Sequence, residues 1–293
     1  MRANNVDSSS GAARRFLLAV VLAAAWLGFN VAFPDLGPTG IPAAVTRLII
    51  HGIILVGLWL GLSRTDFTGG TRVGLWLAIA APFTLWLAVV WGLAVNGVFQ
   101  AIPGIIRVPP PLPVAIFLPV LVGLVLLMRS NRIASLLDAM PLSWLIGLQL
   151  YRILGGIFLV NWAHGAIPGV FALPAGIGDT MVGLLALPVA RWVSSGSPAG
   201  HRVGLAWNLL GLMDFAVAIA MGFLSSPGPL QVFALDHPNV QVGTYPTVMI
   251  PAFGVPSSII LHGLSLWQLR RRARQTALHT QADWHTDLKG STI

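Results

Sequence analysis

Long runs of apolar residues alternate along the chain with short segments rich in Pro, Gly and Asp. Each run is close to the ~20 residues that an α-helix needs to cross a bilayer, and the segments between them are typical of turns. The pattern predicts an all-α, polytopic integral membrane helix bundle with eight spans, at 16–33, 43–62, 73–97, 112–128, 142–162, 171–190, 203–224 and 247–269.

The composition supports this fold class. Of the 293 residues, 56% are hydrophobic and only 9% are charged, whereas an ordinary soluble domain carries about 25% charged residues. So few charges cannot cover the surface of a soluble chain of this length, and the apolar excess must face lipid. The chain has no Cys, which excludes disulfides and thiolate metal sites.

The first run follows Arg14 and Arg15, a pattern that also describes a secretory signal. The run is long for a signal core, and Asn30, Val31 and Ala32 form a poor cleavage site. A retained membrane anchor is therefore favoured over a cleaved signal.

The distribution of Arg and Lys predicts the orientation, because cytoplasmic loops are enriched in basic residues. With a cytoplasmic N-terminus, fourteen of the 17 basic residues lie inside, Arg47 and Arg107 lie outside, and Arg152 lies within a span. Both termini are therefore predicted to be cytoplasmic, in a bacterial-type plasma membrane. The predicted organisation is a cytoplasmic segment 1–15, a single transmembrane domain 16–272 and a cytoplasmic tail 273–293.

Three charges lie well inside predicted spans: Arg152, Asp179 and Asp214. At 1.5 Å per helical residue they reach a similar depth near the middle of the bilayer. A charge there costs about 2.5 to 3.5 kcal/mol, so the three side chains should face one another rather than lipid.

The last four spans, within 142–272, carry most of the other polar groups at this depth. The predicted ion, proton or substrate site comprises the three charged residues and four polar ones, Gln149, Asn208, Ser258 and His262.

One Arg balances only one Asp, so the three charged residues leave a formal charge of −1 that a low-dielectric site does not hold unpaired. A proton on one Asp, a protonated His262 or a bound cation such as Na⁺ would neutralise it. The alternative is a static buried network with one Asp permanently protonated, which would only fix helix packing.

Two further features each allow two interpretations. The apolar, breaker-rich segment 161–178 fits either an interrupted, re-entrant helix that exposes backbone amides beside Asp179 or a short outside turn anchored by Trp162. Arg47 and His51, one helical turn apart, either line an outer vestibule or leave Arg47 to reach the headgroup region.

Other chemistries find little support in the sequence. A haem between His51 and His262 would need ligands at matching depth, which the two spans do not provide. A zinc site combining Asp236, His237 and His164 is a weaker reading than an ordinary turn. No P-loop, HExxH or nucleophile motif occurs, so we expect no cofactor, no resident metal and no catalytic residue. The net positive charge reflects membrane topology rather than nucleic-acid binding.

The sequence favours a proton- or cation-coupled carrier of a small solute over an enzyme. The alternatives are an intramembrane enzyme acting on a lipid-like substrate, with Asp214 as general base beside His262, and a non-catalytic membrane sensor or scaffold. Expected partners are membrane lipids, with Arg270 to Arg274 near anionic headgroups, and a small solute with a proton or Na⁺.

Overall fold

The computed structural model describes residues 41–102 and 107–290, together with isolated positions between 17 and 32. The long segments within these residues are helical, and the described part of the chain contains no β-strand. The elements are α2 (Ile41–Leu62), α3 (Gly69–Val95), α4 (Pro111–Met128), α5 (Asn131–Ala139), α6 (Leu142–Leu148), the 3₁₀ segment η2 (Gln149–Gly156), α7 (Ile157–Ala163), α8 (Gly169–Val193), α9 (Pro198–Ser225), the 3₁₀ turn η3 (Gln241–Gly243), the π-helical segment η4 (Ile250–Gly254) and α10 (Val255–Gly290).

Seven helical stretches in the described residues are long and apolar enough to cross a membrane. They coincide with the second to eighth predicted spans, which confirms that the described chain is all-helical, with seven helices of the length and apolarity that a membrane protein requires. The first predicted span, 16–33, lies largely outside the described residues. The seven stretches are Ala44–Leu62, Gly69–Val95, Pro111–Met128, Leu142–Ala163, Gly169–Val193, Pro198–Ser225 and Ile250–Ala277.

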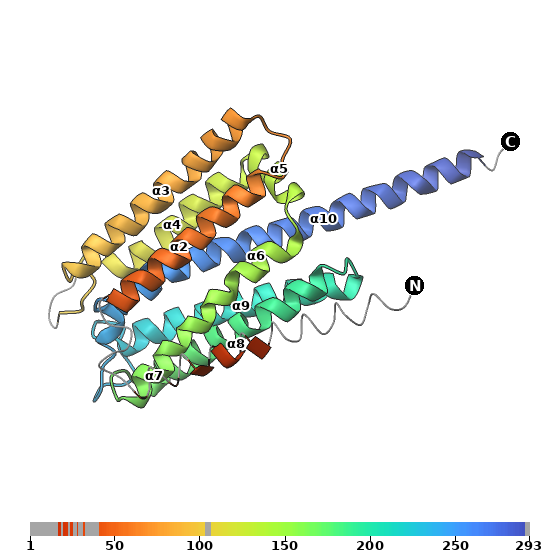
Figure 1. The fold of residues 1–293 in the computed structure, drawn as a ribbon. Coiled ribbons are helices and arrows are strands. Elements are labelled where there is room, and N and C mark those ends of the chain that lie inside the picture. Colours follow the sequence, from red (N-terminus) through yellow and green to blue (C-terminus); the bar gives the residue numbers. More distant parts are fainter. Residues whose placement is uncertain are drawn as a thin grey trace.

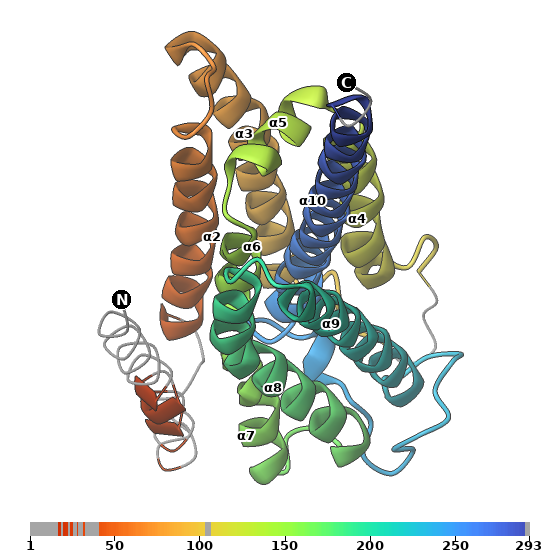
Figure 2. The same ribbon diagram turned by 90° about the vertical axis from the view of Figure 1, so that its right-hand side faces the viewer.

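Successive helices run in alternating directions, so that the connections fall at two ends of the bundle (Figures 1 and 2). One end, the basic end, holds the connections 63–68, 129–141 and 194–197 and the second half of α10. The opposite end holds the turn 164–168 and the connection between α9 and η4. Most Arg residues of the described chain lie at the basic end, in the arrangement that the predicted cytoplasmic face requires.

The four elements that carry the predicted site form the best-packed part of the bundle. In the last four helical stretches, from Leu142–Ala163 to Ile250–Ala277, 56%, 44%, 28% and 50% of the residues in the most apolar part of each are buried, against 17% to 22% for α2, α3 and α4. The first three helices therefore present most of their surface outward. The last four pack against one another around a common interior.

A short amphipathic helix at the basic end, α5, was not predicted. The Ser130 hydroxyl caps it by accepting the backbone N–H of Ile133 at 3.4 Å. Gln268 of α10 donates to the carbonyls of Leu137 at 2.6 Å and Met140 at 2.8 Å, and Arg271 forms an ion pair with Asp138. These contacts fix the start of the fifth span against α10.

The fifth span is not a uniform α-helix. Its middle, η2, is an eight-residue 3₁₀ segment between α6 and α7, and such runs rarely exceed three or four residues. The eighth span likewise begins with π-helical η4. Close packing accompanies η2: a Cβ at Gly183 of α8 would lie 2.5 Å from the backbone nitrogen of Ile153.

The orientation can be tested by labelling, because the natural chain already lacks Cys. We expect Asp236→Cys, exposed at one end, to react with a membrane-impermeant maleimide on intact cells. Ser195→Cys, exposed at the basic end, should react only after permeabilisation, since the basic end is predicted to be cytoplasmic. Labelling of Ser195→Cys alone on intact cells would reverse the predicted orientation.

Candidate functional site

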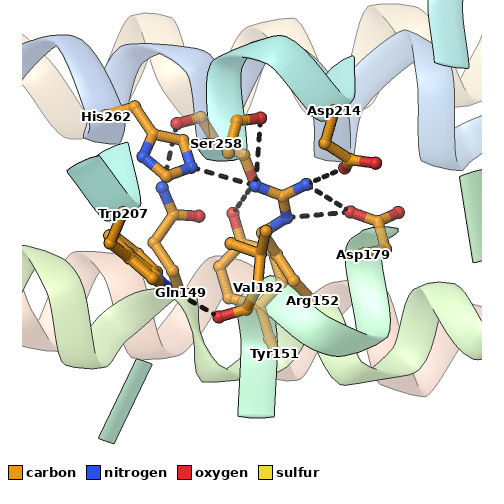
Figure 3. A network of polar contacts seen from close by, with 10 residues as sticks. Gln149, Tyr151, Arg152, Asp179, Val182, Trp207, Asp214, Ser258 and His262 are labelled. Atoms are coloured by element: carbon orange, nitrogen blue, oxygen red, sulfur yellow. Dashed lines mark hydrogen bonds and ion pairs between the residues drawn. The ribbon is translucent and has the colours of Figure 1, made fainter. Parts of the chain in front are cut away.

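Arg152 lies at the centre of a polar cluster in the interior of the last four spans (Figure 3). Its Nε donates to Asp179 Oδ1 at 2.8 Å, and its Nη2 lies 2.8 Å from the same oxygen and also donates to Asp214 Oδ2. Its Nη1 donates to His262 Nε2 at 2.9 Å and approaches the carbonyl of Gly211 at 3.4 Å. Every nitrogen of the guanidinium therefore has an acceptor.

The cluster is almost completely shielded from its surroundings. The side chain of Arg152 is 1% exposed, that of Asp179 11% and that of Asp214 8%. The guanidinium carbon lies 3.8 Å from the centre of the Phe215 ring, whose π-face favours a cation. Arg152 is thus held by two carboxylates on one edge and an aromatic face on one side.

The hydrogen-bond pattern determines the state of His262. A guanidinium can only donate, so Nε2 of His262 must accept from Arg152. The other ring nitrogen, Nδ1, then carries the proton and donates to Asn208 Oδ1 at 2.9 Å, while Asn208 Nδ2 donates to Ser265 Oγ at 3.0 Å. His262 is therefore neutral in this arrangement, and it does not supply the positive charge that one sequence interpretation assigned to it.

Gln149 and Ser258 lie on the other side of Arg152. Gln149 Nε2 donates to the backbone carbonyl of Ser258 at 3.1 Å, and the Ser258 hydroxyl lies 2.6 Å from that of Tyr151. Gln149 Oε1 is buried without a hydrogen-bond partner among the described residues.

The structure brings together all seven residues of the predicted site: Gln149, Arg152, Asp179, Asn208, Asp214, Ser258 and His262. Sequence reasoning missed Tyr151 and Phe215. Phe215 directly follows Asp214, but an aromatic residue in an apolar span carries no signal by itself. Tyr151 was missed because an α-helical projection does not place it on the face of Arg152.

Two glycines allow the carboxylate of Asp214 and the ring of His262 to sit where they do. A Cβ at Gly178 would lie 1.6 Å from Asp214 Oδ1, and a Cβ at Gly211 would lie 2.4 Å from His262 Nε2. Even the smallest side chain at either position would displace a partner of Arg152. Small residues therefore serve both helix approach and site geometry.

The cluster borders two cavities. The larger, of about 80 Å³, extends from Asp179 and Arg152 past Tyr151 and Ser258 to Arg47 of α2. The smaller, of about 50 Å³, is mainly apolar and shares Asp179 and Phe215 with the first. By the same measure one water molecule needs about 10 to 15 Å³, so the larger cavity has room for several waters or a small solute.

The segment 161–178 comprises the end of α7, a short turn at 164–168 and the start of α8, and is not a re-entrant helix. α7 ends at Ala163, α8 begins at Gly169, and Asp179 lies within the continuous helix α8 despite Pro174. The interrupted-helix interpretation is therefore wrong, and backbone amides of a helix start do not reach the cluster.

The histidines of the haem and zinc interpretations make the following contacts. His51 Nε2 pairs with Thr84 Oγ1 at 3.0 Å, its Nδ1 is buried without a partner among the described residues and its ring stacks on Phe83, while both nitrogens of His262 are engaged as described. Among the described residues, no group of three or more His, Asp or Glu side chains is arranged to hold a metal ion, and this includes Asp236 and His237.

The close approach of η2 and α8 makes a testable prediction. Gly183→Ala should lower the stability of the purified protein by about 1 to 3 kcal/mol, because its Cβ meets rigid backbone of η2. Gly147→Ala on α6, where a Cβ would meet no atom within 4 Å, is the matched control and should cost nothing. Thermal unfolding in detergent measures both, and equal melting temperatures for the two variants would contradict the packing.

The comparisons with known proteins bear on the same region. The family described as "Domain of unknown function (DUF8737)" matches residues 109–270, more than half of the chain, and the match contains every residue of the cluster around Arg152. The search of curated proteins and the search of solved structures returned no match. The chain therefore belongs to the DUF8737 family.

Proposed function

We propose that the protein is a proton- or cation-coupled carrier of a small solute in the plasma membrane, with its binding site in the cavity beside Asp179. The observation that carries the proposal is the buried pair of carboxylates, Asp179 and Asp214, that share one guanidinium, with Asp179 and that guanidinium on the wall of this cavity. Membrane lipids, a small solute and a proton or Na⁺ are its proposed partners.

The charge of the cluster supplies the reason for coupling. Arg152 balances one carboxylate, and His262 is neutral in this hydrogen-bond pattern, so two Asp side chains leave a formal −1. A buried charge without a counterion is costly. A proton on either carboxylate or a small cation beside Asp179 restores neutrality, and exchange between the loaded and empty states is the elementary step of a coupled carrier.

Polar groups extend from the carboxylates in both directions along the bundle. The larger cavity leads toward Thr247 and Arg47, at the end opposite the basic one. In the other direction, hydrogen bonds run from Arg152 through His262 and Asn208 to Ser265. The carboxylates therefore lie between two polar routes.

The elements around the cavity also provide places where a span can bend. η2 carries Arg152, and η4 contributes Ile250, Phe253 and Gly254 to the cavity wall. Non-α segments inside a helix often mark hinges or functional sites. Movement at these two segments would open or close the cavity without breaking the long helices.

The geometry gives less support to an enzyme. A general base at Asp214 assisted by His262 requires the two side chains to be partners, but each contacts Arg152 instead. The second nitrogen of His262 is held by Asn208. The carrier accounts better for the same residues, and a sensor or scaffold remains the reading if no solute flux is found.

Removal of either carboxylate charge should abolish coupling. Asp179→Asn and Asp214→Asn each convert the cluster to a neutral one, so that no proton or cation is needed to balance it. In proteoliposomes, wild-type uptake of radiolabelled lactate, glycine or glycerol should depend on pH or Na⁺. Both variants should lose this dependence.

Asp138→Asn is the matched control, because Asp138 also pairs with an Arg but lies at the basic end, outside both cavities. It should retain wild-type coupling. Unchanged pH- or Na⁺-dependent uptake in Asp179→Asn and Asp214→Asn, with both proteins monodisperse, would rule out a coupling role for the cluster.

A further inference from the structure

Arg47 is a second charged group on the wall of the cavity that holds Asp179 and Arg152. It comes from α2, which lies outside the matched family region. Its Nε is buried and has no hydrogen-bond partner among the described residues, and no carboxylate of that part of the chain forms an ion pair with it. Arg47 thus lines a cavity, as the vestibule interpretation expects, whereas His51, the second residue of that interpretation, does not line it and pairs with Thr84.

The two arginines of the cavity differ in what they can offer to a ligand. Arg152 has all three nitrogens engaged with Asp179, Asp214, His262 and the Gly211 carbonyl. Arg47 retains free donors. A guanidinium with free donors binds an oxyanion through two parallel hydrogen bonds, a geometry that a carboxylate matches.

We infer that the transported solute is a small monocarboxylate, held by Arg47 through its carboxylate while the coupling cation occupies Asp179 at the other side of the cavity. This inference rests on the proposed function and names the substrate class of the same site. It rests on three groups that line one cavity. These are the guanidinium of Arg47, which has no hydrogen-bond partner among the described residues, the guanidinium of Arg152, which is fully hydrogen-bonded, and the carboxylate of Asp179.

The charge count favours a monoanion over phosphate. The cavity presents one free guanidinium, whereas a phosphate ester carries about 1.5 to 2 negative charges at neutral pH. A single carboxylate satisfies Arg47 and leaves no excess charge there. The extra cation then resides at the two Asp side chains, so one solute moves with one proton or Na⁺.

The rest of the wall fits a short, partly apolar body. Ile50, Ile250, Phe253 and Val255 contribute apolar surface, and Tyr151 and Ser258, whose hydroxyls lie 2.6 Å apart, contribute polar surface. The volume of about 80 Å³ restricts the solute to a small acid. Its carboxylate would face Arg47 and its body these side chains.

Ligand-induced thermal stabilisation of the purified full-length protein tests the inference without requiring transport. The probes are propionate, glycine as a zwitterion of similar size, neutral propionamide and inorganic phosphate, each in Na⁺ and in choline buffer at two pH values. Propionate should stabilise the wild type only with Na⁺ or at the lower pH. Glycine should need neither, because its ammonium group can occupy the position beside Asp179.

Arg47→Gln should weaken the binding of propionate and glycine about tenfold to a hundredfold, since a charge-assisted pair is lost. Arg47→Lys should lie between, because it keeps the charge but not the two-pronged geometry. Arg107→Gln is the matched control: Arg107 is the other basic residue at this end, and it donates to the Val98 carbonyl away from the cavity.

The outcomes separate this inference from the proposed function. Carboxylate stabilisation that depends on Arg47, without any solute uptake into proteoliposomes, would support the substrate class and overturn the carrier. Stabilisation by propionamide or phosphate in preference to propionate, or equal effects of Arg47→Gln and Arg107→Gln, would overturn the substrate class even if coupled uptake is observed.

Discussion

The pairing of Arg152 with two carboxylates in an apolar helix bundle is the interaction on which the rest of the structure depends. Each of these charges would cost about 2.5 to 3.5 kcal/mol if it stood alone near the centre of a membrane. All three are shielded together, with side-chain exposures of 1% to 11%. Their mutual contact requires η2, α8 and α9 to approach closely, and glycines at 178, 183 and 211 make that approach possible. Packing and electrostatics therefore demand the same arrangement of helices.

The neutral His262 extends this constraint to α10. Arg152 needs an acceptor for Nη1, and an imidazole provides one only while its facing nitrogen is unprotonated. Asn208 stabilises that tautomer by accepting from the opposite nitrogen, and it is in turn held by Ser265 and the Gly204 carbonyl. The guanidinium is thus oriented by partners from three different helical elements, so that a shift of any one of them changes the hydrogen bonds of Arg152.

The sequence predicted the membrane spans and the members of the cluster because both follow from the cost of polar groups in lipid. Arg152, Asp179 and Asp214 were identifiable as charges that no loop explains. The sequence could not predict the 3₁₀ geometry of η2, a segment that packs closely against Gly183 and in which Tyr151 lies beside Ser258. The tautomer of His262 and the choice between a turn and a re-entrant segment also required tertiary contacts. Arg47 shows most clearly what the sequence could not predict, since a position near a helix end fits both a lipid-facing and a cavity-facing side chain.

The position of Arg47 changes the net charge around the proposed binding site. The cluster alone carries −1 and Arg47 carries +1, so the charged groups of the cluster and the cavity wall sum to zero, although they come from separate elements: Arg47 from α2 and the cluster from η2, α8 and α9. A monoanion at Arg47 removes the positive charge that partly offsets the carboxylates, and the affinity of Asp179 and Asp214 for a cation then rises. Linkage requires the converse by the same factor, so a bound cation raises the affinity for the anion. The coupling free energy between anion and cation binding therefore needs no conformational change in this arrangement. Movement at η2 and η4 is needed only to expose the loaded cavity to the other side.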